Sequence, residues 1–471
     1  MKRFRIVVIT GGVFFILALA LALRVRNLAF IPLPGESTDE YGSNAWVGLS
    51  LIRLGVPVGK SGLPGYYGND YRYVNVDHIY SNTARGNPLE INKPWLDHPP
   101  LLPLVTGGFA YLSGARVFED TTAQVIRRPM AIAGVVTVAL TGWLAFLLAG
   151  PVVSLTTLIL IGTSPLMVVS SRIGQSENLL IVFWLLNLIF LSLHLSGANR
   201  KWLWLAAIAS GLSMLSKVSG IVSVIAGVII LLHQPRKRLA VLVSEIVLFG
   251  VVSLSFFALF FVYGAAIDWN VFKNIWTSNI DRTYDIGFSP IFNLITTTKI
   301  TISKLLTDGW PLLGWFGLSF LYGWRDEKSK YFVLLPILIY LVFFLLMGSS
   351  SYGWYRTPFM PFLFIAAAWF LSDGVKNVPR MLQAVLLLIP LGINVGKIVE
   401  ILPSISLTPY LRLGLPSLIL VFVLFEFLPS NIQTKYQKIA KALYLLLFTI
   451  AILSNIVLDY LMTPEYWLQM N

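Results

Sequence analysis

The chain has 471 residues, of which 56% are hydrophobic and 12% are charged, and its mean hydropathy is +0.76. Soluble domains carry about 25% charged residues, so this composition excludes a soluble globular protein and indicates a polytopic membrane protein. The formal net charge of +13 does not require a nucleic-acid partner, because basic residues retained in cytoplasmic loops give the same excess. The sequence has no cysteine, which excludes disulfides, thiolate metal sites and cysteine nucleophiles.

The N-terminus is basic and continues as an apolar run from Ile6 to Leu23. A cleaved signal peptide is the alternative, but the run is long for the apolar region of such a segment, and no clear cleavage site precedes Arg24. We therefore expect a retained first span over residues 6–27, with its N-terminus inside. A long polar segment follows it to about residue 122.

Further apolar blocks bring the expected number of spans to about thirteen, each near the twenty residues that a bilayer requires. Their centres lie near Val136, Ile159, Phe183, Ala207, Ala226, Leu248, Gly317, Ile337, Ile365, Leu387, Ile419 and Phe448. An odd number of spans puts the C-terminus outside. The short loops then assigned to the inside are rich in Lys and Arg, as the positive-inside rule requires. These loops are residues 199–201, 235–238, 325–330, 376–380 and 435–441.

The predicted fold class is therefore an all-α polytopic membrane protein, with interfacial helices in a large first outer loop. We expect three parts: residues 1–122 with the first span and that loop, 123–373 as the transmembrane core, and 374–471 as C-terminal spans. A second long outer loop is expected over residues 265–307. Large outer loops suggest that the chemistry takes place at the outer face.

Two adjacent carboxylates, Asp39 and Glu40, stand where the first span emerges into water. Helical spacing follows them and ends at Gly55 and Pro57, which predicts an amphipathic helix along the membrane surface. The apolar stripe of that helix consists of Tyr41, Ala45, Leu49 and Ile52. A structural role is the alternative, because Ser37 and Glu40 have the spacing of a capping box.

A second motif in the first outer loop is Asp97-His98-Pro99-Pro100. Proline after a polar residue is a good helix start, so we expect an interfacial helix over residues 99–112. The N-terminus of that helix and His98 could face an anion. The alternative is a plain capping aspartate beside a solvent-facing histidine.

Three further sites carry ionisable side chains at the outer ends of predicted spans. Such side chains need a polar partner or water there. Arg172 and Glu177 lie in the short loop between the third and fourth spans, and Lys217 lies between two spans with almost no loop. A loop ion pair is the alternative for the first two. In another tight loop, Arg356 follows Trp354 and Tyr355.

The loop with Arg356 could bind a phosphate through its guanidinium and stack a sugar on its aromatic rings. An interfacial aromatic belt with a snorkelling arginine is the alternative. All these sites fall on one face, so we expect His98, Arg172 and Arg356 to converge on one phosphate-sized site beside Asp39.

The order of these motifs resembles that of the GT-C membrane glycosyltransferases of the protein O-mannosyltransferase and lipid A aminoarabinose transferase (ArnT-like) type. The motifs are Thr38-Asp39-Glu40-Tyr41, Asp97-His98-Pro99-Pro100-Leu101, Arg128-Pro129, Ser171-Arg172 with Glu177-Asn178, and Leu215-Ser216-Lys217. The resemblance covers roughly residues 1–370 and agrees with about thirteen spans. It implies a polyprenyl-phosphate-linked sugar donor, and it implies that Asp39 binds and activates the acceptor.

The chemistry of such a transfer, which needs a cationic pocket for the leaving phosphate and a base for the hydroxyl, suggests roles for the sites. Asp39 and Glu40 would be catalytic. The donor phosphate would be bound by His98, Arg172, Lys217 and Arg356, and the substrate by Asp97, Glu177, Trp354 and Tyr355. The family usually has lysine where this chain has His98, which makes phosphate binding depend on protonation. No cofactor is firmly implied. A divalent metal at Asp97 stays open, although no histidine follows His233 to complete such a site.

We conclude from the sequence that the chain moves a sugar from a polyprenyl-phosphate donor to an acceptor hydroxyl, with inversion at the anomeric carbon. The expected location is the plasma (cytoplasmic) membrane, with the active site facing outward. The alternative is a transporter or flippase of lipid-linked sugars, but such proteins usually carry internal repeats and ionisable residues near mid-span. A non-catalytic scaffold would not need the acid pair. The sequence identifies neither the sugar nor the acceptor, which could be a protein, a lipid or a glycan.

Overall fold

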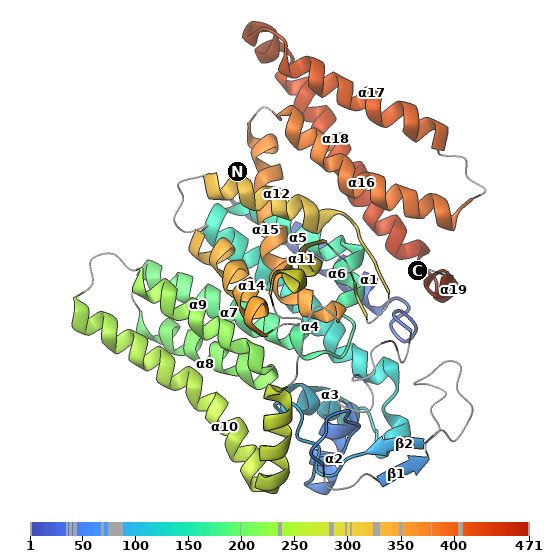
Figure 1. Ribbon diagram of the computed structural model, residues 1–471. Coiled ribbons are helices and arrows are strands. Elements are labelled where there is room, and N and C mark those ends of the chain that lie inside the picture. The colour runs from blue at the N-terminus through green and yellow to red at the C-terminus, as the bar shows by residue number, and fades with distance from the viewer. Residues whose placement is uncertain are drawn as a thin grey trace.

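The computed structural model describes residues 2–33, 36, 40, 45–66, 70–73, 88–197, 199–233, 238–281, 287–296, 299–301, 304–323, 330–347, 352–377, 379–403 and 408–469. Long apolar helices form the body, and a small layer of short elements lies at one end of it (Figure 1). The fold class predicted from the sequence, a helical polytopic membrane protein, is confirmed.

Every predicted span centre falls inside a helix. The helices concerned are α1 (Lys2–Val25), α4 (Ala123–Ala149), α5 (Pro151–Thr163), α7 (Ser176–Gly197), α8 (Arg200–Ser216), α9 (Ile221–Leu232), α10 (Leu239–Ile280), α12 (Trp310–Gly323), α14 (Leu335–Met347), α15 (Met360–Lys376), α16 (Met381–Ile401), α17 (Thr408–Glu426) and α18 (Ser430–Leu461). Within the described ranges, 7 helical stretches are long and apolar enough to cross a membrane, and shorter apolar helices accompany them. The predicted number of about thirteen membrane crossings therefore stays a prediction.

Short helical segments connect these helices. They are α6 (Pro165–Ser170), η3 (Val218–Gly220), α11 (Phe288–Thr296), η4 (Lys330–Leu334), η5 (Gly353–Phe359) and α19 (Pro464–Gln469). In Figure 1, α8, α9 and α10 form a group on the left, and α16, α17 and α18 form another at the upper right. Between them, α15 is buried along almost its whole length and forms the centre of the main apolar core.

The outer layer comes from the segment between α1 and α4. It contains α2 (Trp46–Leu54), α3 (Leu101–Leu112), η2 (Phe118–Asp120) and two short antiparallel strands, β1 (Asp70–Tyr73) and β2 (Pro88–Ile91). The predicted stop of α2 is confirmed, because Gly55 has a left-handed φ of 70° and donates its N–H to Leu51 O. A helix, α3, is present where the interfacial helix over residues 99–112 was expected, and its place at the membrane interface stays a prediction. The strand pair was not predicted.

Close packing of α2 on α3 depends on two glycines. A Cβ added to Gly48 would lie 1.6 Å from Pro103 O, and one added to Gly107 would lie 2.3 Å from Gly48 C. Both distances are far below van der Waals contact. Only glycine therefore lets the two helix backbones approach this closely.

The expected outer loop over residues 265–307 is wrong in part, because much of it is helical. The described helix α10 continues to Ile280 through a break at Asp268, where φ is −167° and ψ is 105°. The Asp268 carboxylate accepts the N–H of Val271 at 3.0 Å, so this side chain caps a new helical segment. The new segment persists because Phe272 and Ile275 are buried in an apolar cluster with Leu63 and Leu96 of the outer layer.

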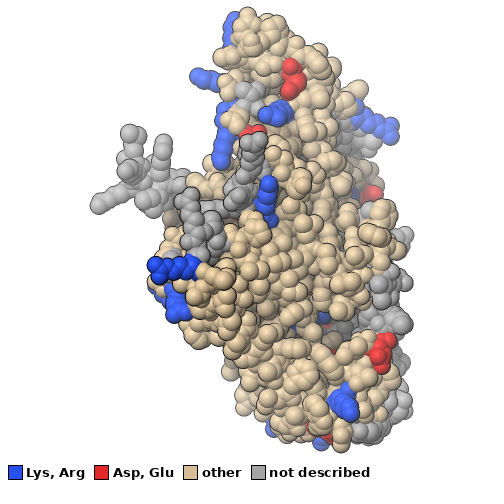
Figure 2. Space-filling view, turned by 60° about the vertical axis from the view of Figure 1, so that its left-hand side comes forward, with Lys and Arg blue, Asp and Glu red and all other residues tan. Residues whose placement is uncertain are grey.

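Charged side chains avoid the middle of the face shown in Figure 2. On that face Lys and Arg gather toward the upper and left-hand margins, and a broad uncharged surface lies between these and the lower end. Such a belt is the surface expected of a protein that spans a bilayer.

Candidate functional site

A cavity of about 450 Å³ lies where the outer layer meets the helical body. Its walls come from the segment before α3, from the turn between α8 and α9, from both parts of α10, from α14 and from η5. The lining residues are Asp97, His98, Met214, Lys217, Val218, Ser219, Ile221, Phe257, Trp276, Asn279, Ile280, Phe343, Phe344, Met347 and Tyr355. Four of the residues predicted from the sequence thus meet here: Asp97, His98, Lys217 and Tyr355.

Lys217 is the cation of this cavity, and two neighbours fix its side chain. Its Nζ lies 2.5 Å from Glu177 Oε1 and 4.1 Å above the centre of the Tyr355 ring. The Lys217 side chain is 19% exposed and the Glu177 side chain 1%. The second oxygen of Glu177, Oε2, is buried without a hydrogen-bond partner. The loop ion pair considered for Glu177 is therefore present, but its partner is Lys217.

The Asp97 carboxylate is held by two hydroxyl groups. Ser61 Oγ donates to Asp97 Oδ2 at 2.5 Å, and the Tyr66 hydroxyl donates to Asp97 Oδ1. Burial, together with the neighbouring Asp97 charge, raises the pKa of Tyr66, so Tyr66 stays a donor. Asn279 Nδ2 donates to Asp97 O at 3.2 Å and ties this segment to the far part of α10. Sequence reasoning missed Ser61 and Tyr66, which lie more than thirty residues before Asp97.

His98 lies beside Asp97 at the wall of the same cavity and packs edge-on against Trp95, with 5.9 Å between ring centroids. The helix that follows, α3, begins at Leu101 with Pro100 as its N-cap residue. The helix start that the sequence predicts after the two prolines is thus present.

The remaining cavity wall is apolar. Phe257, Phe343, Phe344, Met347 and Ile280 supply most of it. The cavity thus combines polar and ionisable side chains, among them Asp97, His98 and Lys217, with a larger hydrocarbon and aromatic surface. This combination suits an amphiphile with a charged head and an apolar chain better than it suits a wholly polar ligand.

A divalent metal at Asp97 does not fit the described residues. Both oxygens of its carboxylate accept hydrogen bonds from hydroxyl groups. The described residues contain no group of three or more His, Asp or Glu side chains that could hold a metal ion. A metal site usually needs three or four such ligands.

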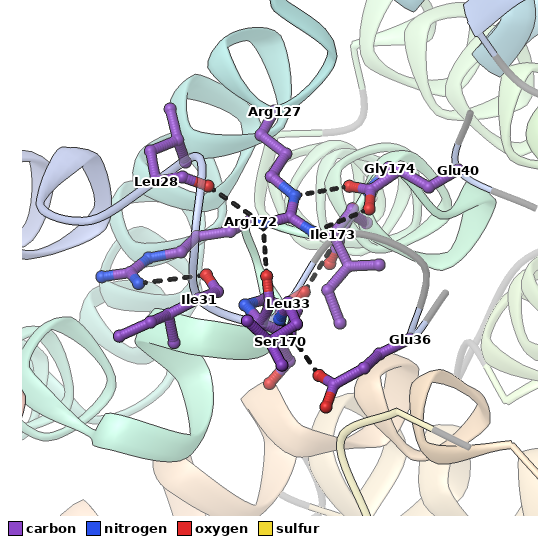
Figure 3. A network of polar contacts seen from close by, with 12 residues as sticks. Leu28, Ile31, Leu33, Glu36, Glu40, Arg127, Ser170, Arg172, Ile173 and Gly174 are labelled. Atoms are coloured by element: carbon purple, nitrogen blue, oxygen red, sulfur yellow. Dashed lines mark hydrogen bonds and ion pairs between the residues drawn. The ribbon is translucent and has the colours of Figure 1, made fainter. Parts of the chain in front are cut away.

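Glu40, the described member of the acid pair, is not among these lining residues. Asp39 is not among the described residues, so its position stays a prediction. Glu40 is fully buried, and Arg127 of α4 contacts both of its oxygens at 2.9 Å (Figure 3). Gly174 N donates to the same carboxylate at 2.9 Å. This arrangement makes Glu40 an anchor for the segment around it. The only sequence signal for Arg127 was a cation at the mouth of an apolar span.

Of His98, Arg172 and Arg356, which the sequence predicts to converge on one site, only His98 lines this cavity. Arg172 is 3% exposed and donates to the backbone carbonyl of Ile31 (Figure 3) and to that of Leu23. It therefore joins the end of α1 to the loop before α7. The guanidinium finds its hydrogen bonds in backbone that the sequence pattern could not place nearby.

Arg356 is likewise buried, at 2% exposed, and donates to Asn293 O at 3.1 Å. Trp354 stacks on Tyr352 with 4.9 Å between ring centroids. Within this loop the structure thus brings Tyr355 to the cavity, while Trp354 stacks inside the loop and Arg356 bonds to α11.

Comparison with known proteins gives the family context of this fold. Residues 97–263 match the family described as dolichyl-phosphate-mannose-protein mannosyltransferase. No curated protein sequence matches the chain. Among solved structures, ArnT from Cupriavidus metallidurans bound to undecaprenyl phosphate is similar with a TM-score of 0.57 and 15% identity, covering 96% of this chain and 77% of that chain.

Its apo state gives a TM-score of 0.56 and 16% identity, with the same coverage of 96% and 77%. The oligosaccharyltransferase AglB from Archaeoglobus fulgidus gives a TM-score of 0.45 and 14% identity, covering 95% of this chain and 55% of that chain. At such identities the likeness to ArnT concerns the fold. The resemblance stated from the sequence, to GT-C glycosyltransferases of the mannosyltransferase and ArnT type, is confirmed.

Proposed function

We propose that this chain, which has the GT-C fold of membrane glycosyltransferases, transfers a sugar from a polyprenyl-phosphate donor to an acceptor hydroxyl. The observation that carries the proposal is a single cavity lined by Lys217 and His98 together with mostly apolar side chains. ArnT, whose fold this chain shares, has been solved with undecaprenyl phosphate bound. A phosphate at Lys217 with its isoprenoid chain along Phe343 and Met347 would use both parts of the cavity.

The reaction needs a base for the attacking hydroxyl and a stabilised leaving group. The acceptor oxygen forms a bond to the anomeric carbon while the bond from that carbon to the phosphate oxygen breaks. The proton of the acceptor passes to Asp39, and the polyprenyl phosphate leaves with the electron pair. Lys217 and protonated His98 are suited to stabilise the charge that develops on the phosphate. Attack opposite the leaving phosphate inverts the anomeric carbon.

Orientation follows from the two ends of α8. Arg200 and Lys201 stand at its N-terminus and Lys217 just past its C-terminus. Its 17 residues separate them by about 25 Å. The positive-inside rule assigns the first two to the cytoplasm, so the cavity would open at the outer face of the plasma membrane. A label that reacts from outside with Ser113→Cys, but not with Lys201→Cys, would support this orientation, and the reverse pattern would exclude it.

Binding of undecaprenyl phosphate by purified protein in detergent tests the donor site. We expect Lys217→Met to weaken binding about tenfold or more, because one charge-assisted contact is lost. Lys201→Met is the matched control, since Lys201 lies exposed at the other end of the same helix. Equal affinity of both variants and the wild type would remove Lys217 from the donor site.

Transfer of label from polyprenyl-phosphate sugars tests the catalytic step. A placed carboxylate base contributes about 10²–10⁴-fold in rate, so Asp39→Asn should lose at least a hundredfold in turnover and still bind undecaprenyl phosphate. Turnover of Asp39→Asn above a tenth of the normal rate would remove Asp39 from the mechanism. Movement of labelled lipid across vesicles without transfer would favour a flippase.

A further inference from the structure

The C-terminal end of the chain lies against the segment that follows α1 (Figure 1). Trp467 of α19 donates its Nε1–H to Glu36 Oε2 at 2.8 Å. Asn27 Nδ2 donates to Met462 O at 3.1 Å, and Arg26 Nη2 donates to Tyr460 O at 2.7 Å. Three hydrogen bonds therefore join positions more than four hundred residues apart in sequence.

Burial makes the bond between Trp467 and Glu36 specific. Trp467 is 0% exposed, so its indole N–H has no access to water, and the Glu36 oxygen satisfies it. The same oxygen accepts the N–H of Leu33 at 3.1 Å, which folds the segment back on itself. Burial raises the pKa of the Glu36 carboxyl, and the bond from Trp467 opposes that rise, so the indole favours the ionised acid.

Glu36 and Glu40 fix two points on one short segment. Figure 3 shows Glu36 reaching to Leu33 while Glu40 reaches to Arg127. The first anchor depends on α19 and the second on α4. Asp39 lies between Glu36 and Glu40 in sequence. A carboxylate that acts as a base must be held closely, because a shift of about 1 Å at a reacting group can cost 10²-fold in rate.

We propose that Trp467 and Glu36 are positioning residues for sugar transfer: helix α19 holds the segment that leads to Asp39. This inference rests on the proposed function, in which Asp39 is the base. It assigns the C-terminal helix a part in the rate of the reaction, although neither Trp467 nor Glu36 lines the cavity for the donor. The alternative is that α19 only secures the end of α18 to the body.

Four variants separate these two roles. Trp467→Phe keeps the aromatic ring and removes the donor, whereas Glu36→Ala removes the acceptor. Glu36→Gln keeps an oxygen that can accept from the indole, so it should restore function relative to Glu36→Ala. Tyr466→Phe is the matched control, because it removes a 3.4 Å hydrogen bond to Glu400 from the exposed side of the same helix.

The measurements are turnover, undecaprenyl phosphate affinity and melting temperature of the full chain. We expect Trp467→Phe and Glu36→Ala each to lower turnover at saturating donor about tenfold, with donor affinity unchanged within twofold. The double variant should lose no more than either single one, because both remove the same bond. Glu36→Gln and Tyr466→Phe should stay within threefold of the wild type.

Normal turnover of Trp467→Phe and Glu36→Ala would overturn the inference, as would a lowered melting temperature with unchanged turnover of the folded protein. Asp39→Asn is assayed in parallel to keep the two hypotheses apart. An active Asp39→Asn protein contradicts the role of Asp39 as the base in the proposed function. An inactive Asp39→Asn protein beside a fully active Trp467→Phe protein contradicts only the positioning role.

Discussion

Lys217, which lines the cavity, forms a nearly buried ion pair with Glu177, with 2.5 Å between Nζ and Oε1. The positive charge of Lys217 is thus already balanced by the negative charge of Glu177. A phosphate bound there would share Lys217 with Glu177, whose other oxygen lacks a partner. The pair should therefore have separable effects on folding and on ligand binding.

Lys217→Met should destabilise the protein by about 3–5 kcal/mol, because it leaves the Glu177 charge buried and unpaired. Adding Glu177→Gln should recover most of that stability, since no unpaired charge then remains. Affinity for undecaprenyl phosphate should stay low in the double variant. Melting temperature and binding, measured on both variants and on Glu177→Gln alone, test this separation. Recovery of affinity with stability would mean that Lys217 acts only through folding.

Arg127 and Glu40 should matter mainly for folding. Arg127→Met leaves the Glu40 carboxylate buried without its cation, which should cost about 3–5 kcal/mol. Glu40→Gln should cost less, because Arg127 Nη1 keeps its bonds to Leu28 O at 3.0 Å and Pro32 O at 2.7 Å. Thermal unfolding in detergent measures both.

The control for this pair is Arg128→Met, a change of the exposed arginine next along α4. It should leave the melting temperature nearly unchanged. Equal losses in Arg127→Met and Arg128→Met would contradict the anchoring role and point to a general effect of charge on α4.

Gly48→Ala should disrupt the contact between α2 and α3. The new methyl group would fall 1.6 Å from Pro103 O, which is backbone and cannot rotate away. Overpacking of this kind costs about 1–3 kcal/mol or more. Gly108→Ala is the control, because its Cβ would meet only Ile52 Cδ1 at 3.9 Å. That change should stabilise α3 slightly, by up to about 1 kcal/mol, since alanine favours helix.

Limited proteolysis of the outer layer and the melting temperature report the outcome of the two glycine changes. Opposite signs for Gly48→Ala and Gly108→Ala are expected. Similar melting temperatures would show that the two helices can separate without loss of stability.

Tyr66→Phe should lower stability by about 1.5–3 kcal/mol, the usual contribution of a hydrogen bond to a charged group. The folded pKa of Tyr66 is raised above its unfolded value, so this contribution is fully present below the unfolded pKa of about 10. It is lost only as the pH rises through the folded pKa. The stability difference between wild type and Tyr66→Phe should thus be constant from pH 6 to about 9. A difference that disappears below pH 9 would contradict the assignment.

The helices of this protein could be predicted from hydrophobic blocks alone. Long apolar runs, such as those around Val136 and Ile365, form helices in a bilayer and little else. Gly55 marks a helix end, because that position needs a left-handed backbone conformation. Polar partners could not be predicted in the same way. Lys217 and Glu177 are forty residues apart, and each stands at a different span mouth.

The arginines show the same limit more clearly. A cation at a span mouth must find acceptors, and the sequence indicates this need for Arg172 and Arg356. Both side chains donate to backbone carbonyls, and only the folded arrangement of distant loops brings those carbonyls within reach. Arg127 was missed because its carboxylate partner, Glu40, lies 87 positions away in the sequence.

The break at Asp268 has a mechanical consequence. If α10 were a continuous helix, any tilt of the part before Asp268 would also move Trp276 and Ile280 at the cavity wall. The extended residue between the two parts of α10 supplies torsions that can absorb such a tilt, while Asn279 stays bonded to Asp97 O. We therefore expect the wall formed by Trp276 and Ile280 to change less with bilayer thickness than a continuous helix would allow.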